Sequence, residues 1–434
     1  MLIFIQWQHF LFRHEHGVRD YLFLENPLYK NRHLFLRLGA GCVSLLFYLK
    51  VLLFPKTLLS YYGYNQIDVL HPNLFVIISS VIIVLVSAVF VLKHFREKNI
   101  LTYGILFFFI SISMFLNLLI PAVGIVADRF AFIPSLGFCI VISVFLFTIF
   151  KIPYTFSESK MSTWKISFVS VSLLLIVLSS LRVIARNPDW KNHFSLYAHD
   201  VKIASKSAKL NALYAAGCMV HATSATDNVT KKQWVEAGIF YYQKAINIYP
   251  KYAAALHNLG AAYVMYSGDY NKAIDLMKKT IACDSTYVEA YFNIGACYQV
   301  QKNYGEAEKY YLKAIAFKPQ FANPYKNLSM IYCSRKQYQK AIELNNTAIS
   351  RGVKSETPYI DIGNVYIYEN DTAKALQEYD TAMIINPGNK PICYFLVRYY
   401  QRKNDTLKYD KYETLLQQDQ TQDEIQAPPS LISE

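Results

Sequence analysis

The 434-residue sequence lacks the short motifs that mark several large classes of enzyme. It contains no GxSxG, HExxH, P-loop or GxGxxG, so no motif supports a serine hydrolase, a zinc protease, a P-loop nucleotide hydrolase or a dinucleotide-binding enzyme. The seven cysteines form no CxxC pair and no Cys/His spacing of a metal site. We therefore expect small buried thiols, no metal site and no evident cofactor.

Acidic residues are scarce in the first half of the chain. Lys and Arg exceed Asp and Glu by 11 in residues 1–210 (20 against 9), but only by 2 in residues 211–434 (24 against 22). A net charge of +13 could suit nucleic acid, yet the excess lies where it flanks apolar segments. Orientation in a membrane and attraction to anionic lipid explain it better, so we expect membrane lipids as partners and no nucleic acid.

Long stretches without charge distinguish the first half from the second. A run such as LFVIISSVIIVLVSAVFVL, residues 74–92, is close to the roughly 20 residues needed to cross a hydrocarbon core of about 30 Å. The sequence predicts an all-α fold, with a membrane bundle of about five spans followed by a helical solenoid. The expected spans are 34–54, 73–92, 100–120, 134–150 and 164–184.

Basic residues alternate between the loops that join these spans. Segments 13–33, 93–99 and 151–165 hold ten Lys or Arg residues, whereas loops 55–72 and 121–133 hold one each. The positive-inside rule places the first group in the cytoplasm. The part after residue 186 then lies on the periplasmic or lumenal side. We expect a bacterial inner membrane, or an ER membrane if the source is eukaryotic.

The second half is a helical repeat with a period of 34 residues. Four registers recur at this step: Tyr291, Tyr325 and Tyr359; Gly295, Ser329 and Gly363; Tyr298, Tyr332 and Tyr366; Ala307, Ala341 and Ala375. This is the period of the tetratricopeptide repeat (TPR), a pair of helices that packs only against its neighbours. One extra residue precedes Ala273 in an earlier unit, and residues 394–416 resemble a degenerate cap.

The sequence therefore divides into five predicted parts. They are an interfacial or juxtamembrane segment (1–33), a transmembrane domain (34–186), a connector that contains Trp190 (187–210), a TPR domain (211–417) and a disordered tail (418–434).

One register of the repeats is polar. Asn258, Asn293, Asn327 and Asp361 precede the small residue by two positions, on the helix that lines the inner surface of a TPR superhelix. A carboxamide can donate to and accept from a peptide backbone at once, so these residues are candidate peptide-binding groups. The alternative is an ordinary polar face, since such residues are common on exposed helices.

The stretch VADRFAFIPS places Asp128 and Arg129 in an outward loop directly before a span. An arginine at that depth is costly unless it meets an anion, and a lipid phosphate is the nearest one. Arg129 is therefore a candidate ligand of a lipid phosphate. Two alternatives remain open: Arg129 pairs with Asp128, or it extends to the interface.

Four stretches carry a resemblance to the transmembrane and tetratricopeptide-repeat-containing (TMTC) family. They are ENPLY (25–29), FPKTLLSYYGY (54–64), ADRFAFIPSLGFCIVIS (127–143) and RNPDWKNHFSLYAHD (186–200). The family resembles type C (GT-C) glycosyltransferases, which transfer a sugar, mannose in the animal members, from a polyprenyl-phosphate carrier to proteins. The resemblance implies that Arg129 binds the donor phosphate, that Asp128 orients its guanidinium, and that Trp190 pins the repeats to the last span.

The same resemblance leaves the catalytic residue unassigned. In the family an acidic pair lies in an outward loop that precedes the ENPLY position, whereas this sequence begins close to that position. A transferase needs a carboxylate to deprotonate the acceptor hydroxyl. Asp68 and Asp128 lie in outward loops, but neither matches the family's catalytic position. Two functions stay open: protein O-glycosylation by an enzyme incomplete as given, and a non-enzymatic membrane-anchored TPR scaffold at the cell envelope.

Overall fold

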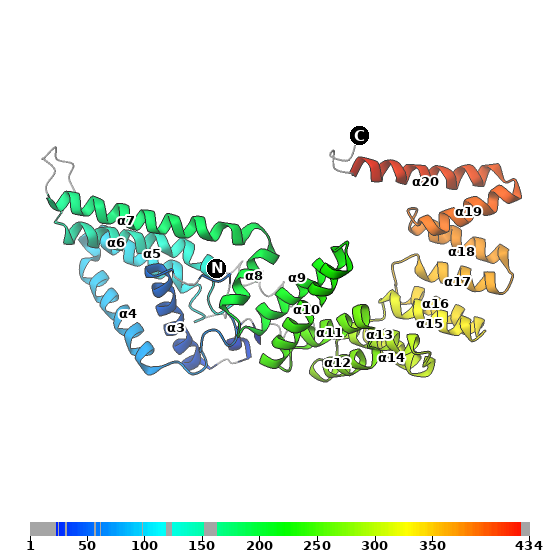
Figure 1. Cartoon of the computed structure of the whole chain (residues 1–434), viewed down its shortest axis with the longest axis horizontal. Coiled ribbons are helices and arrows are strands. Elements are labelled where there is room, and N and C mark those ends of the chain that lie inside the picture. The colour runs from blue at the N-terminus through cyan, green and yellow to red at the C-terminus, as the bar shows by residue number, and fades with distance from the viewer. Residues whose placement is uncertain are drawn as a thin grey trace. The chain divides into compact units, whose positions relative to one another are not determined.

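The computed structural model describes residues 23–24, 26–30, 33–55, 58–60, 62–97, 99–118, 124–151 and 163–426. These residues are helical or irregular, apart from one isolated antiparallel bridge between Tyr62 and Val126. Two compact units divide the chain, Met1–Ala262 and Tyr263–Glu434. Figure 1 shows the helices in chain order, with the apolar helices in the first unit and successive helix pairs in the second.

Four helices of the first unit are long and apolar enough to cross a membrane, within the part of the chain that the structure describes. They are α3 (Leu34–Leu53), α4 (Leu74–His94), α6 (Phe132–Ile149) and α7 (Thr163–Arg186). Short 3-10 turns lie beside them: η1 (Pro27–Lys30), η2 (Phe95–Glu97), η3 (Asp128–Ala131) and η4 (Asn187–Lys191). Four of the predicted spans thus correspond to long apolar helices.

The third predicted span, 100–120, is shorter in the structure. Its helix α5 covers Ile100–Ser113, and the chain then turns through Asn117, which has a positive φ of 60°. The Asn117 side chain is fully buried; it donates to the Ile125 carbonyl at 2.9 Å and accepts from Asn26 Nδ2 at 2.7 Å. A buried amide must be hydrogen-bonded, and these partners require the backbone to leave the helix.

The α5 segment nevertheless runs back along α6 in close contact. A Cβ added to Gly137 would lie 2.6 Å from the Phe108 backbone nitrogen and 2.7 Å from the Gly104 carbonyl. Backbone atoms cannot move aside as a flexible side chain can, so only glycine allows this approach. The α5 and α6 helices therefore form a tight hairpin.

Three loops that are distant in sequence meet at one end of this bundle. Tyr62 pairs with Val126 through the isolated bridge, and the Ser60 backbone nitrogen donates to Asp200 at 2.8 Å. The Arg182 Nε also donates to the Pro55 carbonyl at 2.9 Å. The loop after α3, the loop after α5 and the segment after α7 thus share one end, as the predicted alternation of spans requires.

The first helices of the second half belong to the same unit as the membrane bundle. They are α8 (His193–Ile203), α9 (Ala208–Ser224), α10 (Asn228–Ile248) and α11 (Ala253–Ala262). Asn192 and Ser195 form a reciprocal capping box that begins α8. The Tyr64 and Tyr249 rings meet edge to face at 5.6 Å, so the loop after α3 packs against the end of α10.

The second unit is a succession of helix pairs. Its helices are α12 (Tyr270–Cys283), α13 (Val288–Val300), α14 (Tyr304–Phe317), α15 (Ala322–Ser334), α16 (Tyr338–Ser350), α17 (Thr357–Tyr368), α18 (Thr372–Ile385), α19 (Lys390–Lys403) and α20 (Thr406–Gln426). A π-helical turn, η5 (Tyr263–Ser267), precedes them and accommodates the extra residue predicted before Ala273. The α20 helix continues to Gln426, into the predicted tail; residues 427–434 lie outside the described residues.

In α13, α15 and α17 the small residue of the repeat is in contact with a side chain 16 positions later. Gly295 faces the Tyr311 ring, which would lie 2.7 Å from an added Cβ, and Gly363 faces Tyr379 in the same way. The middle repeat has Ser329 instead, and its Oγ accepts from Asn345 at 2.9 Å. Glycine is therefore needed where a tyrosine fills the space, and serine is tolerated where the partner is the smaller asparagine.

Candidate functional site

Arg129 lies on the 3-10 turn η3, between the bridged residue Val126 and the start of α6. The neighbouring Phe130 stacks on Phe115 with ring centroids 4.5 Å apart, which fixes the turn against the bundle. The Arg129 side chain is exposed; its carbon Cζ lies 4.9 Å from the centre of the Phe130 ring, and Nη1 donates to the Ser60 carbonyl at 3.4 Å. These contacts leave guanidinium N–H groups available for an anion.

Asp128 does not pair with Arg129 in the structure. Its carboxylate accepts a hydrogen bond from the Leu59 backbone and interacts electrostatically with Arg186, while the oxygen Oδ1 is buried without a hydrogen-bond partner among the described residues. The two neighbouring side chains therefore have different surroundings. Asp128 points into the protein, and Arg129 is exposed.

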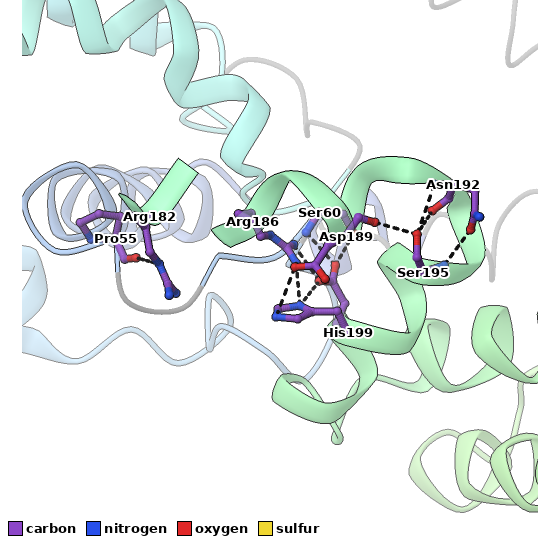
Figure 2. A network of polar contacts seen from close by, with 9 residues as sticks. Pro55, Ser60, Arg182, Arg186, Asp189, Asn192, Ser195 and His199 are labelled. Atoms are coloured by element: carbon purple, nitrogen blue, oxygen red, sulfur yellow. Dashed lines mark hydrogen bonds and ion pairs between the residues drawn. The ribbon is translucent and has the colours of Figure 1, made fainter. Parts of the chain in front are cut away.

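Arg186 at the end of α7 is the centre of a buried polar network, shown in Figure 2. Its guanidinium donates to Asp189 Oδ2 and to Asp200 Oδ1, each at 2.9 Å, and its Nη1 lies 2.6 Å from His199 Nδ1. Asp200 is fully buried, and its other oxygen accepts from the Ser60 backbone nitrogen at 2.8 Å and from Ser60 Oγ at 2.6 Å. Both carboxylate oxygens of Asp200 are thus occupied.

This network joins α7, η4, α8 and the loop after α3. Arg186 binds one oxygen of Asp189 through Nη1 and one oxygen of Asp200 through Nη2, so the guanidinium is held by two charge-assisted hydrogen bonds to different residues. The same Ser60 that binds Asp200 also accepts from Arg129 through its carbonyl. The network is therefore linked to Arg129 through Ser60.

Sequence reasoning did not select Arg186, Asp200 or Ser60 as functional residues. The stretch RNPDWKNHFSLYAHD, which carries part of the family resemblance, could have pointed to two of them, because Arg186 and Asp200 are its first and last residues. Trp190, which the resemblance implies to be the pinning residue, is 49% exposed, with Arg186 Cζ 5.8 Å from its ring centre. Arg186 and Ser60 both contact α8, through His199 and Asp200.

The predicted polar register is found on successive inner helices. Asn293 and Asn327 are half-buried on α13 and α15, and Asn258 is half-buried on α11 in the first unit. Asn327 Nδ2 donates to Tyr311 Oη at 3.0 Å, and His257 Nδ1 lies 3.2 Å from Asn258 Oδ1. At least part of the hydrogen-bonding capacity of Asn258 and Asn327 is therefore used within the protein.

Asp361 differs from the asparagines in this register. It is 7% exposed on α17, and its Oδ2 is buried without a hydrogen-bond partner among the described residues. Burial raises the pKa of this carboxyl to about 7, although the positive charge of Lys326 opposes the shift. The last member of the register is thus a group that changes charge near neutral pH.

No group of three or more His, Cys, Asp or Glu side chains suitable for a metal ion occurs among the described residues. Asp68, in the loop after α3, is exposed, and its Oδ1 accepts from the His71 backbone nitrogen at 2.9 Å. Asp68 is not part of the Arg186 network.

Two segments of the chain match the family described as "Tetratricopeptide repeat", residues 241–275 and residues 288–321. The helix pairs are tetratricopeptide repeats. The TPR period predicted from the sequence is therefore confirmed.

The chain is distantly similar to TMTC protein O-mannosyltransferases over part of its length. It is 27% identical to "Protein O-mannosyl-transferase TMTC1" of Mus musculus over 244 residues, which are 54% of this chain and 24% of that protein. It is 25% identical to "Protein O-mannosyl-transferase Tmtc3" of Drosophila melanogaster over 151 residues, 34% of this chain and 14% of that protein. The chain thus spans a quarter or less of these relatives.

Two solved structures are similar to this chain over part of its length. "Crystal structure of MamA" has 27% identity, covers 38% of this chain and 96% of that chain, and has a TM-score of 0.32. "Crystal structure of YrrB: a TPR protein with an unusual peptide-binding site" has 16% identity, covers 46% of this chain and 96% of that chain, and has a TM-score of 0.34.

Proposed function

We propose that this chain takes part in protein O-glycosylation of the GT-C type. In this proposal the membrane bundle binds the phosphate of a polyprenyl-phosphate-linked sugar, and the TPR array holds the acceptor polypeptide. The observation that carries the donor half of the proposal is the setting of Arg129. Its side chain is exposed beside an apolar helix, with one hydrogen bond to the Ser60 carbonyl and no ion pair to Asp128.

The chemistry of a lipid phosphate fits that setting. A phosphate at the headgroup level can accept from the remaining guanidinium N–H groups, and the attached polyprenyl chain would lie along apolar helix surface. Phe132 and Ile133 at the start of α6 are 80% and 57% exposed. They would contact the isoprenoid units nearest the phosphate.

The TPR array supports the second half of the proposal. Successive inner helices carry Asn293 and Asn327 at one register, where carboxamides can bind a peptide backbone without selecting its sequence. Asp361, at the next step of the register, is a buried carboxyl. Asn258 has the same register in the first unit. Protein–protein binding by the tetratricopeptide repeats does not depend on whether the membrane bundle binds the donor lipid.

We further propose that the array lies on the periplasmic or lumenal side of the membrane. The loops near Ser60 and Arg129 and the segment after Arg186 share one end of the bundle, and loops 55–72 and 121–133 at this end hold one basic residue each. A bacterial inner membrane is the proposed location, or the ER membrane in a eukaryote.

A membrane-anchored TPR scaffold is the second candidate function. It is favoured by the surroundings of the two carboxylates considered as catalytic bases. Asp128 is held by the Leu59 backbone and by Arg186, and Asp68 accepts from the His71 backbone. Neither carboxylate lies free beside Arg129, so the catalytic base is unassigned.

Arg129→Ala tests the donor site. We expect the purified protein in lipid nanodiscs to bind a short-chain polyprenyl phosphate about 10–100 times more weakly, because charge-assisted hydrogen bonds to the phosphate are lost. Binding can be followed by the ³¹P NMR line width of the lipid phosphate. The scaffold function predicts no specific binding by either protein.

Arg182→Ala is the matched control for this experiment. Arg182 is an exposed arginine near the same end of the bundle, where its Nε donates to the Pro55 carbonyl at 2.9 Å. The Arg182→Ala variant also removes one positive charge, so a general electrostatic effect on an anionic lipid would weaken lipid binding equally in both variants. Equal affinities of the two variants would contradict a specific role for Arg129.

A further inference from the structure

The helix α19, near the end of the TPR array in Figure 1, carries an exposed stripe of aromatic and cationic side chains. An open pocket of about 530 Å³ lies along this stripe. The residues that line it are Pro391, Tyr394, Phe395, Arg398, Tyr399 and Arg402. The name "α19 stripe" refers to these six residues.

The stripe faces away from the core of the array. Cys393, Leu396 and Tyr400 are buried and form the core-facing side of the same helix. At 3.6 residues per turn, positions 391, 395, 398 and 402 fall on the opposite side. Arg398 and Arg402 are thus on the exposed side of the helix, whereas Tyr399 packs against the core at the edge of the stripe.

The stripe also continues the polar register of the inner helices. Phe395 lies 34 residues after Asp361, which is itself 34 residues after Asn327. The inner position that carries carboxamides in earlier repeats therefore carries an aromatic ring in the last helix pair. Its ring contacts Tyr379 of α18 edge to face at 5.3 Å, which holds it in place.

The two arginines of the stripe have no acidic partner in the part of the chain that the structure describes. Arg398 and Arg402 are exposed, and neither forms an ion pair among the described residues. This contrasts with Arg335, which pairs with Glu308 at 3.3 Å in an earlier repeat. Two unneutralised guanidinium groups beside three aromatic rings favour an anionic ligand that also has an apolar or planar group.

The spacing of the arginines identifies the class of ligand. Residues four apart on a helix are separated by about 6 Å along its axis. Alternate side chains of an extended peptide lie on one face, about 6.7 Å apart. Two carboxylates with one residue between them would therefore match Arg398 and Arg402.

We propose that the α19 stripe binds an extended acidic segment of a partner polypeptide, with Asp or Glu at alternate positions and an adjacent aromatic or proline residue. Arg398 and Arg402 bind the carboxylates, and Tyr394, Phe395 and Tyr399 contact the apolar residue. The inference rests on the polypeptide-binding part of the proposed function and extends it to the last helix pair, and it does not depend on the donor lipid.

The test uses the full chain in nanodiscs and a fluorescein-labelled peptide with the core Phe-Pro-Asp-Ser-Glu. Fluorescence anisotropy should show binding that weakens with salt, and the Asn/Gln version of the peptide should bind about tenfold more weakly or worse. The double variant Arg398→Gln/Arg402→Gln should lose affinity for the acidic peptide to a similar extent. Both arginines are exposed, so the array should remain folded, which circular dichroism can verify.

Lys309→Gln/Lys313→Gln provides a matched control, because these lysines are also four residues apart but lie on the outer helix α14. It should leave peptide binding unchanged. Equal binding of the acidic and neutral peptides, or equal loss in the α14 variant, would overturn the proposal.

If instead Asn293→Ala/Asn327→Ala abolishes binding and the arginine variant does not, the acidic-segment proposal fails while polypeptide binding by the array stands. Binding of polyprenyl phosphate by the same preparations reports on the donor site separately.

Discussion

Asp200→Asn is expected to lower the stability of the first unit by about 3–5 kcal/mol, the usual consequence of breaking a buried ion pair. Asp200 is fully buried and uses one carboxylate oxygen for Arg186 and the other for two donors of Ser60. An amide has one acceptor oxygen, so either Arg186 or Ser60 must lose its partner. The measurement is the unfolding midpoint in a mild detergent, from tryptophan fluorescence.

A second readout of this variant tests the positioning role of the network. Because Ser60 also accepts from Arg129, loss of the Asp200 contact should release the loop after α3 and weaken polyprenyl phosphate binding. The control is Asp371→Asn, which alters an exposed ion pair with Lys374. Exposed pairs contribute little, so the control should leave polyprenyl phosphate binding unchanged and lower stability only slightly. An Asp200→Asn protein as stable as the parent would show that the network is not a structural element.

Asp361→Asn is expected to stabilise the TPR array at neutral and alkaline pH. Asp361 is buried with one unpartnered oxygen, at the register where preceding repeats have asparagine, and its pKa is raised to about 7 in the folded state. The charged form is thus disfavoured by folding. A neutral amide removes that cost, which is on the order of 2–4 kcal/mol when the carboxyl is fully ionised.

The sign of the pH dependence follows from the direction of the shift. In the unfolded chain the carboxyl ionises at its ordinary pKa near 4, whereas in the folded array it holds its proton to about pH 7. The unfolded state therefore binds fewer protons in this window, and the stability of the parent falls as pH rises from about 4 to 7. The benefit of Asp361→Asn should grow over the same window and remain constant above it.

Thermal unfolding of the full chain between pH 4 and pH 9, followed by circular dichroism, measures this effect. The exposed Asp371 again offers the control, because its hydrogen bonds to Lys374 hold its pKa below the usual value. Asp371→Asn should reduce stability slightly, and only above the pKa of that carboxyl. A stability difference between parent and Asp361→Asn that does not vary with pH would contradict the assigned ionisation.

The repeats could be predicted because their packing is local. Each helix pair contacts mainly its neighbours, so the same steric need recurs every 34 residues and leaves a register visible in one sequence. The pairing of Gly295 with Tyr311, and of Ser329 with Asn345, shows the reason for the small residue. The sequence shows both residues of each pair, but it does not show that they are in contact in the fold.

The membrane unit could be predicted only in part. Apolar runs indicate the long helices, but hydropathy does not register the amide of Asn117, whose buried hydrogen bonds end α5 at Ser113. The Arg186 network brings together residues up to 140 positions apart, between Ser60 and Asp200. Such a contact depends on the tertiary arrangement of three loops. A single sequence therefore shows the motif that contains Arg186 and Asp200, but not that Ser60 contacts it.

The most direct test of the account is the side of the membrane on which the array lies. Epitope tags inserted after Glu434, beside Asn65 and within the 3-10 turn Phe95–Glu97 can be probed with an antibody before and after permeabilisation. The account predicts that the first two tags are reached from the non-cytoplasmic side and the third only from the cytoplasm. A carboxyl-terminal tag that is reached only from the cytoplasm would contradict both the sugar-transfer proposal and the presentation of acceptor proteins by the repeats.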